Sequence, residues 1–262
     1  MRTLLCLAAT AAGLFAQTAP PNEAGVSLGH IHLMVSDADA QKKAWVDVFG
    51  AQSTGNGAAF DPLKLPGIFI IITKSAMPPA GGTNGSVVNH IGLSVKDYAA
   101  TKAKWTADNL TAREVTPNAQ ALVNFPEGVT VEVIENKDQA TPVAFHHIHE
   151  SVVDGEAARA WYMKEFGAAS GTRRNLPAAM FPGGEVDFMK AQMPQEPTKG
   201  RSLDHIGFEV KDLDALLKKL AADGVTINMP LRDMTKQIGL KIAFITDPNG
   251  TYIELTQGLS AK

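Results

Sequence analysis

One eight-residue motif occurs four times in this sequence and constrains the fold more than any other feature. Each copy reads His, Ile, then His or Gly, two variable positions, Val, one variable position and Asp, and the copies span residues 30–37, 90–97, 147–154 and 205–212. Repeats spaced by roughly 60 residues are typical of one supersecondary unit that is copied several times and buries its apolar face against a neighbouring copy. The sequence therefore predicts a chain of four related modules.

Each copy of the motif begins with a predicted β-strand. In the fourth copy, Ile206, Phe208 and Val210 alternate with His205, and this period of two places apolar side chains on one face and the histidine on the other. Glu150 interrupts the apolar row in the third copy. We expect the Asp that ends each motif to open a helix, and the histidines to face away from the layer that the helices cover.

The first residues resemble a secretory signal. Arg2 gives a positive start, residues 4–15 are almost wholly apolar, and small residues follow, which predicts a signal peptide over residues 1–16, or to about residue 19. A membrane anchor would need about 20 apolar residues, and Gln17 ends the run too early. The protein is therefore expected to be exported, to a periplasm or to the outside of the cell.

The leader also contains the only cysteine, Cys6. The mature protein is then expected to lack disulfides and thiol chemistry, so that any metal must be held by His and carboxylate side chains. The formal net charge is −3, and no Lys/Arg run is interleaved with aromatic residues. Nothing indicates a nucleic-acid partner, or a membrane partner after signal cleavage. The expected partner is a small-molecule substrate, and a homodimer is left open.

The four modules alternate in type. The first and third share the sequence Phe-Gly-Ala after the predicted helix, whereas the second and fourth close with a turn and a strand that ends in Glu132 or Glu254. Because consecutive elements usually pack together and a short polar linker separates the halves, we expect one domain over residues 26–137 and a second over residues 144–258. Crosswise pairing, first with fourth and second with third, remains the alternative.

All seven histidines fall in the four predicted first strands, at positions 30, 32, 90, 146, 147, 149 and 205. A lone histidine is more often structural, but four equivalent ones, joined by Glu132 and Glu254, favour metal binding. Two imidazoles and one carboxylate with open positions are typical of a divalent first-row metal, above all Fe(II), with Mn or Zn as alternatives. Each half offers one set, and whether one or both sets bind metal is open.

The repeated histidine, the helix-opening Asp and the closing segment Asp247–Glu254 together resemble the vicinal oxygen chelate superfamily of glyoxalases, bleomycin resistance proteins and extradiol dioxygenases. The resemblance implies an α+β fold of four βαβββ modules that pair into two open-barrel domains, with a metal on the concave face. Transferred to this sequence, it gives two ligand sets, which are His147, His205 and Glu254, and His30, His90 and Glu132.

The resemblance further implies an enzyme of isomerase, lyase or dioxygenase type that acts on a small oxygenated organic substrate chelated to the metal. The alternative is a metal-free binding protein like the bleomycin resistance proteins. Two departures limit the match. The fourth ligand of glyoxalase I falls on Ile70 or Ile71 and on Phe188 unless Asp187 substitutes, and the tyrosine of the dioxygenases is replaced by Phe244.

Other residues are candidates for catalysis or substrate binding. His32 and His149 follow a ligand candidate by two positions, which suggests a general base beside the metal, or a buried polar residue satisfied by the backbone. Tyr252 shares a strand face with Glu254 and is a catalytic candidate that could contact substrate. Cations that could receive an anionic substrate group, or that are only solvated, are Arg173, Arg174, Lys199 and Arg201.

Overall fold

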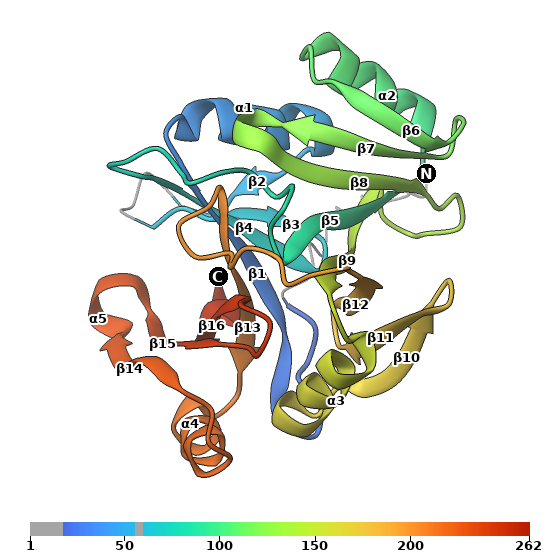
Figure 1. The fold of residues 1–262 in the computed structure, drawn as a ribbon. Helices are drawn as coiled ribbons and strands as arrows, with labels where there is room; N and C mark the ends of the chain where they lie inside the picture. The colour runs from blue at the N-terminus through green and yellow to red at the C-terminus, as the bar shows by residue number, and fades with distance from the viewer. Residues whose placement is uncertain (1–17, 56–59) are drawn as a thin grey trace, which may run out of the picture.

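The computed structural model describes residues 18–55 and 60–262. It contains two eight-stranded mixed sheets and a few short helices, which confirms the predicted α+β class and the four βαβββ modules (Figure 1). The predicted signal peptide, residues 1–16, lies outside the described residues. In the described part of the chain, no helix combines the length and the apolar character needed to cross a bilayer.

The first sheet contains the first and fourth modules. The first module consists of β1 (Val26–Val35), α1 (Ala38–Phe49), β2 (Gln52–Ser53), β3 (Leu63–Leu65) and β4 (Ile68–Lys74). The fourth consists of β13 (Leu203–Val210), α4 (Leu213–Ala222), β14 (Ile227–Met234), α5 (Thr235–Ile238), β15 (Leu240–Thr246), β16 (Tyr252–Gln257) and the 3-10 turn η2 (Leu259–Ala261).

The second sheet contains the second and third modules. The second module consists of β5 (Val88–Val95), α2 (Tyr98–Ala107), β6 (Ala112–Thr116), β7 (Gln120–Phe125), the 3-10 turn η1 (Pro126–Gly128) and β8 (Val129–Glu135). The third consists of β9 (Val143–Val152), α3 (Gly155–Phe166), β10 (Ala169–Arg173), β11 (Leu176–Phe181) and β12 (Gly184–Lys190).

The modules pair crosswise, so the prediction that each half pairs within itself was wrong. The strand orders are β14-β15-β16-β13-β1-β4-β3-β2 and β10-β11-β12-β9-β5-β8-β7-β6. Figure 1 shows the blue β1 beside the orange-red strands of the fourth module. The predicted ranges 26–137 and 144–258 each combine one module from each sheet, and therefore do not match the strand pairing.

The linkers give the physical reason for this pairing. The linker that the sequence suggested as a domain boundary, residues 136–142, is the shortest one and joins β8 to β9 inside the second sheet. A short connection keeps consecutive elements together, so it favours pairing of the second module with the third. The linkers that follow β4 and β12 cross from one sheet to the other and lie side by side. The N–H of Ala80 donates to the carbonyl of Gly200 (2.9 Å), and the N–H of Ser202 donates to the carbonyl of Gly81 (2.9 Å).

The repeated aspartates start the four helices as predicted. Each is the N-cap, and its carboxylate accepts a hydrogen bond from the backbone N–H three residues later, at 2.8 to 3.0 Å. This bond satisfies a donor that a helix start otherwise leaves free. Gly50 ends α1 with φ 71°, a left-handed conformation that glycine adopts at little cost.

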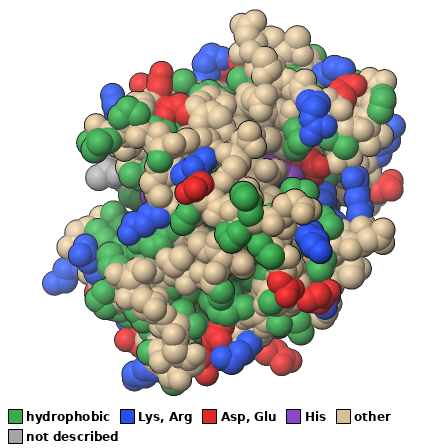
Figure 2. All heavy atoms as spheres, viewed as in Figure 1, with side chains coloured by type: hydrophobic (Ala, Val, Ile, Leu, Met, Phe, Trp, Pro, Cys, Tyr) green, Lys and Arg blue, Asp and Glu red, His purple; other side chains and the backbone are tan. Residues whose placement is uncertain are grey.

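The apolar faces of the two sheets share one core, which leaves their polar faces for the histidines. Trp45 of α1 contacts Phe125 of β7 in the other sheet (ring centroids 5.0 Å apart), and Phe166 of α3 contacts Phe208 of β13 (4.9 Å). Helices of one sheet therefore pack on strands of the other. On the face drawn in Figure 2, little histidine surface is visible.

Glu150, which interrupts the apolar row of the third module, connects the two sheets. It is fully buried on β9, and its Oε1 accepts hydrogen bonds from the Tyr162 hydroxyl (2.9 Å) and the Thr251 hydroxyl (2.8 Å). Thr251 directly precedes β16 of the other sheet. A buried carboxyl is costly unless it is hydrogen-bonded, and here its partners come from both sheets.

Candidate metal and catalytic site

The first sheet gathers His30, His32, His205 and Glu254 into a group that we call cluster A. One donor atom of each lies within 4.8 Å of the others. The Nε2 atoms of His30 and His205 lie 2.9 and 3.0 Å from the same atom, Oε2 of Glu254. His30 comes from β1 and the other two from β13 and β16, so the cluster needs both modules of the sheet.

Asp204 fixes the orientation of one ligand candidate in cluster A. The Nδ1 atom of His205 lies 2.6 Å from Oδ1 of Asp204, which leaves Nε2 directed at Glu254. A carboxylate behind a histidine is a common support for metal ligands. Sequence reasoning missed this residue, although an Asx residue directly before the histidine occurs in both even modules, as Asn89 and Asp204.

The charges of cluster A are interdependent. Burial by itself would raise the pKa of Glu254, but the hydrogen bonds from His205 and His30 hold that pKa well below its usual range. Burial would also lower the pKa of His205, yet the bonds to Asp204 and Glu254 outweigh it and raise that pKa. Burial and then His205 lower the pKa of His32 well below its usual value, so that the His32 imidazole is neutral near pH 7.

The third position of the motif is histidine in the odd modules and glycine in the even ones, and the glycine makes room for the first histidine of the paired module. His30 lies opposite Gly207, and His32 lies opposite His205. A Cβ atom at Gly207 would fall 2.0 Å from Cε1 of His30, so only glycine leaves room for that imidazole. The His32 and His205 rings lie 4.4 Å apart. Each module of the pair thus shapes the space for the ligand candidate of the other.

The residues of cluster A fit a divalent first-row metal. Two imidazole nitrogens and a carboxylate oxygen converge, and all three side chains are buried. Buried Nδ1 atoms of His30 and His32 have no hydrogen-bond partner among the described residues, although buried polar atoms usually have one. His30, His205 and Glu254 would hold the ion, which would act as a Lewis acid on a bound oxygen.

Aromatic residues lie beside cluster A. Phe244 stacks on Tyr252 with centroids 4.8 Å apart, and both rings meet the His205 ring edge-on, at 5.0 and 5.8 Å. The Lys199 ammonium lies 4.6 Å from the centre of the Tyr252 ring. Tyr252 and Lys199, both predicted to contact substrate, are therefore neighbours of the cluster. An apolar surface and a cation stand next to the candidate metal ligands.

The second sheet gathers His90, His147, His149 and Glu132 into cluster B. The Nε2 atoms of His147 and His90 lie 3.1 and 3.7 Å from Oε2 of Glu132. Burial and then the bonds from the two histidines determine the pKa of Glu132, which lies well below its usual range because the bonds prevail. Burial lowers the pKa of His147 to about 4. His149 contacts the carboxylate of Asp187.

The structure redistributes the predicted ligand sets. In the predicted set of His147, His205 and Glu254, His30 takes the place of His147. In the predicted set of His30, His90 and Glu132, His147 takes the place of His30. This correction follows directly from the crosswise pairing. Of the two predicted catalytic histidines, His32 lies in cluster A beside His30, and His149 lies in cluster B beside His147, each beside the histidine that precedes it in its motif.

Three of the four predicted substrate cations are engaged with the protein. Arg173 contacts Glu132, and Arg174 donates to Oε1 of Gln120 (3.0 Å). Arg201 donates to the carbonyls of Gly82 and Asn84, both at 3.0 Å, and so holds the linker after β4. Lys199 contacts only an aromatic ring among the described residues, and it is exposed.

Strand register identifies the position of the fourth ligand of glyoxalase I. Glu132 pairs with Gly92 and Glu254 pairs with Gly207, two residues after the first-strand histidine. The matching pairs in the odd modules are Asp187 with His149 and Ile71 with His32. The position in the third module therefore belongs to Asp187 and not to Phe188. In cluster A it belongs to Ile71, which offers no ligand atom.

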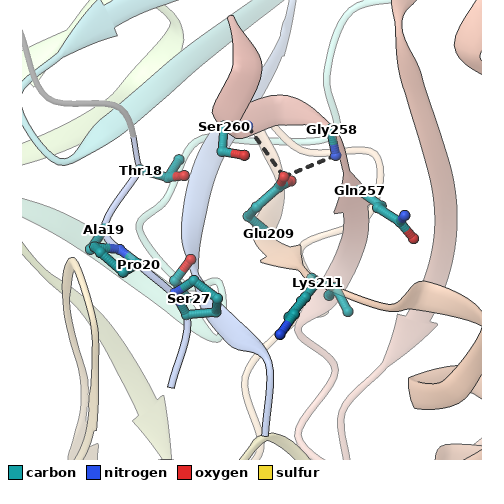
Figure 3. Close-up of a pocket in the computed structure, with 11 residues that line it drawn as sticks. Thr18, Ala19, Pro20, Ser27, Glu209, Lys211, Gln257, Gly258 and Ser260 are labelled. Atoms are coloured by element: carbon teal, nitrogen blue, oxygen red, sulfur yellow. Dashed lines mark hydrogen bonds between the residues drawn. The ribbon is translucent and has the colours of Figure 1, made fainter. Parts of the chain in front are cut away.

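A separate pocket with a volume of about 570 Å³ lies next to the C-terminal segment (Figure 3). Glu209 lines it, and its Oε1 accepts hydrogen bonds from the N–H groups of Gly258 (2.9 Å) and Ser260 (3.2 Å), while Oε2 accepts one from Thr256 (2.7 Å). This carboxylate thus anchors the end of the chain. The pocket is lined by none of the cluster residues.

Comparison with known proteins places this geometry in a family. The family model for the glyoxalase/bleomycin resistance protein/dioxygenase superfamily matches residues 87–255. No curated protein is similar enough in sequence to count as a relative.

Two solved structures show the same fold. Glyoxalase I from Zea mays has a TM-score of 0.68 at 15% identity, over 90% of this chain and 94% of its own. A candidate dioxygenase from Bacillus subtilis has a TM-score of 0.64 at 16% identity, over 93% and 86%. At such identities the likeness concerns the fold alone. Together with the family model, the repeated modules and the paired sheets, it shows that this chain belongs to the glyoxalase/bleomycin resistance protein/dioxygenase superfamily.

Proposed function

We propose that this protein is an exported metal-dependent enzyme that acts on a small oxygenated organic molecule at cluster A. The observation that carries the proposal is the convergence of His30 and His205 on one oxygen of buried Glu254, at 2.9 and 3.0 Å. Two imidazoles and one carboxylate suit Fe(II), with Mn or Zn as alternatives. Export rests on the leader sequence, residues 1–16.

The donor set favours substrates with neighbouring oxygen atoms. Ile71 occupies the place of a fourth protein ligand, so coordination positions stay open for two oxygens of a substrate, or for one of them and O2. When bound, the ion would polarise such an oxygen and stabilise negative charge that develops on it. Isomerase, lyase and dioxygenase reactions all use this effect.

The remaining residues of the site supply proton transfer and orientation. His32 lies beside the ligand candidates, and its Nε2 lies 2.8 Å from the Thr73 hydroxyl, which fixes the ring. A fixed neutral imidazole can take a proton from a carbon or oxygen next to the polarised group. Tyr252 and Phe244 offer an apolar wall, and Lys199 offers a positive charge to an anionic part of the substrate.

Metal binding tests the proposal. After treatment with a chelator and its removal, wild-type protein should bind one Fe(II), Mn(II) or Zn(II) ion that depends on Glu254, and its melting temperature should rise with the free ion concentration. Glu254→Gln keeps the shape of the side chain but removes its charge, and should abolish both effects. Glu132→Gln in cluster B is the matched control.

The measurement is the number of ions per chain after equilibrium dialysis, with the melting curve alongside. An ion whose binding survives Glu254→Gln would contradict the site. A folded wild-type protein that takes up none of the three metals would instead favour the metal-free binding function. A metal-loaded protein should then be assayed for turnover of small molecules with adjacent oxygen atoms.

A further inference from the structure

Cluster B differs from cluster A because an arginine, Arg173, lies beside Glu132 and contacts two further carboxylates. The Nη2 atom of Arg173 lies 2.9 Å from Oε2 of Glu132, the same oxygen that faces His147 and His90. Its Nε lies 3.4 Å from Glu185, and its Nη1 lies 3.4 Å from Asp187. The side chain is only 11% exposed. One guanidinium thus contacts three acidic side chains.

The hairpin between β10 and β11 positions this arginine. Arg174 and Asn175 have φ values of 48° and 74°, which is typical of the tight turn that joins two antiparallel strands. In the strand order, β10 is at one edge of the sheet while β8, which carries Glu132, lies far along it. Arg173 can reach Glu132 only because the sheet curls into an open barrel.

A second layer of contacts holds Glu132 and the hairpin together. The side-chain amide of Gln120 donates to Oε1 of Glu132, and Arg174 donates to Oε1 of Gln120 at 3.0 Å. Both oxygens of Glu132 therefore have protein partners, one from Gln120 and one from Arg173. This is a preformed arrangement, since the contacts come from β7, β8 and β10.

We propose that the Arg173 guanidinium is the built-in cation of cluster B and excludes a metal ion from it. The guanidinium is permanently charged and its fork suits carboxylate oxygens. A divalent ion next to it would place positive charges a few ångströms apart in a buried site, where repulsion is strong. Of the two clusters, only cluster A then binds a metal, although both carry two motif histidines and one glutamate.

Cluster A lacks an equivalent cation. Among the described residues, Glu254 forms ion-pair contacts with His30 and His205 but with no Arg or Lys side chain. In the first module, β2 and β3 correspond to β10 and β11 of the third, and the sequence from residue 52 to 65 contains no arginine. The cation in this stretch, Lys64, lies over the ring of Phe69. The difference between the clusters therefore lies in the hairpins and not in the repeated motif.

Removal of the arginine should turn cluster B into a metal site. Arg173→Met keeps much of the side-chain length but leaves Glu132 and Asp187 without their cation, beside the imidazoles of His90 and His147. Two nitrogens and two carboxylate oxygens form a donor set for Co(II) or Zn(II). The side chains that remain in cluster B therefore determine which metal ion is expected to bind.

The experiment uses the full chain with cluster A silenced by Glu254→Ala, and Co(II) as the probe. Glu254→Ala alone should bind no ion after equilibrium dialysis. The Glu254→Ala, Arg173→Met double variant should bind one ion per chain, with a visible Co(II) absorption band. A further Glu132→Gln substitution should remove that ion. Arg173→Lys and Arg174→Met, each combined with Glu254→Ala, are controls that retain a cation at 173 and should bind none.

Two results would overturn the proposal. One is Co(II) binding that depends on Glu132 in the Glu254→Ala variant, in which Arg173 is intact. Because Arg173 is not substituted in this measurement, it is informative even if Arg173→Met fails to fold. The other is a folded Arg173→Met double variant that binds no ion. Neither result depends on whether cluster A binds metal, so the test is independent of the proposed function.

Discussion

Gly207→Ala is expected to destabilise the protein by about 3 kcal/mol or more and to abolish metal binding at cluster A. The added Cβ would lie 2.0 Å from Cε1 of His30, which is fully buried. Overpacking of a filled interior typically costs about 1 to 3 kcal/mol, and more where the neighbour cannot move. His30 cannot move without leaving Glu254. Chemical denaturation and metal titration measure the two effects.

Two further variants separate this clash from a general effect of alanine. Gly171 also lies in a strand, but a Cβ there would meet the flexible Met180 side chain, so Gly171→Ala should cost well under about 1 kcal/mol. His30→Ala in the Gly207→Ala background should recover part of the lost stability without restoring metal binding. If Gly207→Ala is as stable as wild type and binds metal normally, the His30 ring does not lie over Gly207.

The repeated motif was enough to predict the modules, because each of its positions has a local role. The histidine and glycine follow the period of a strand, and the aspartate caps a helix whose first free N–H groups need an acceptor. These interactions involve residues close in sequence. Neither the cap nor the strand face depends on which module lies next to it.

The pairing of modules could not be predicted from the motif. Each pair needs a glycine module and a histidine module, because His30 fits over Gly207 just as His147 fits over Gly92. Pairing within each half would satisfy this rule equally well. Contacts specific to the crosswise arrangement, such as Glu150 with Thr251, join residues far apart in sequence and carry no local pattern.

The contacts of Arg173 in cluster B could not be predicted from the sequence either. Its sequence neighbourhood suggested a loop cation available to substrate, whereas the curled sheet brings it to Glu132. A cation near a turn looks the same in sequence whether it is solvated or buried among carboxylates. Only the strand order and the curvature of the sheet decide between these outcomes.

Glu150→Gln is expected to stabilise the protein at neutral pH by about 1 to 3 kcal/mol, the usual range for burial of a polar group, because it removes a buried carboxyl whose ionisation is unfavourable. Burial and then the neighbouring Asp247 raise the pKa of Glu150, and burial raises the pKa of Asp247 to about 6. A raised carboxyl pKa means that the folded state holds a proton that the unfolded state releases. The stability that these two groups contribute is therefore fully present below their ordinary pKa values and is lost as the pH rises through the raised ones, which for Asp247 is about 6.

The substitution removes this penalty without removing the hydrogen bonds. The oxygen of the new side-chain amide can still accept from the hydroxyls of Tyr162 and Thr251. Urea unfolding of wild type and Glu150→Gln from about pH 4 to 8 measures the effect. The two curves should meet near about pH 4 and diverge as the pH rises, because only wild type has to keep the Glu150 carboxyl protonated.

Glu165→Gln is a control for which we expect the opposite change in stability. Glu165 is also buried, but the ammonium groups of Lys164 and Lys219 each lie 2.8 Å from its oxygens. The substitution removes the closest anionic partner of both lysines, which then keep only their contacts with Asp223. Because a buried carboxylate that is already paired is lost, this variant should lose stability at neutral pH. The contrast follows from the partners, because hydroxyls donate hydrogen bonds to Glu150 but supply no charge. Two results would contradict a raised pKa of the buried Glu150 carboxyl. One is a wild-type protein whose stability stays constant over this pH range, and the other is a Glu150→Gln variant that is less stable than wild type at neutral pH.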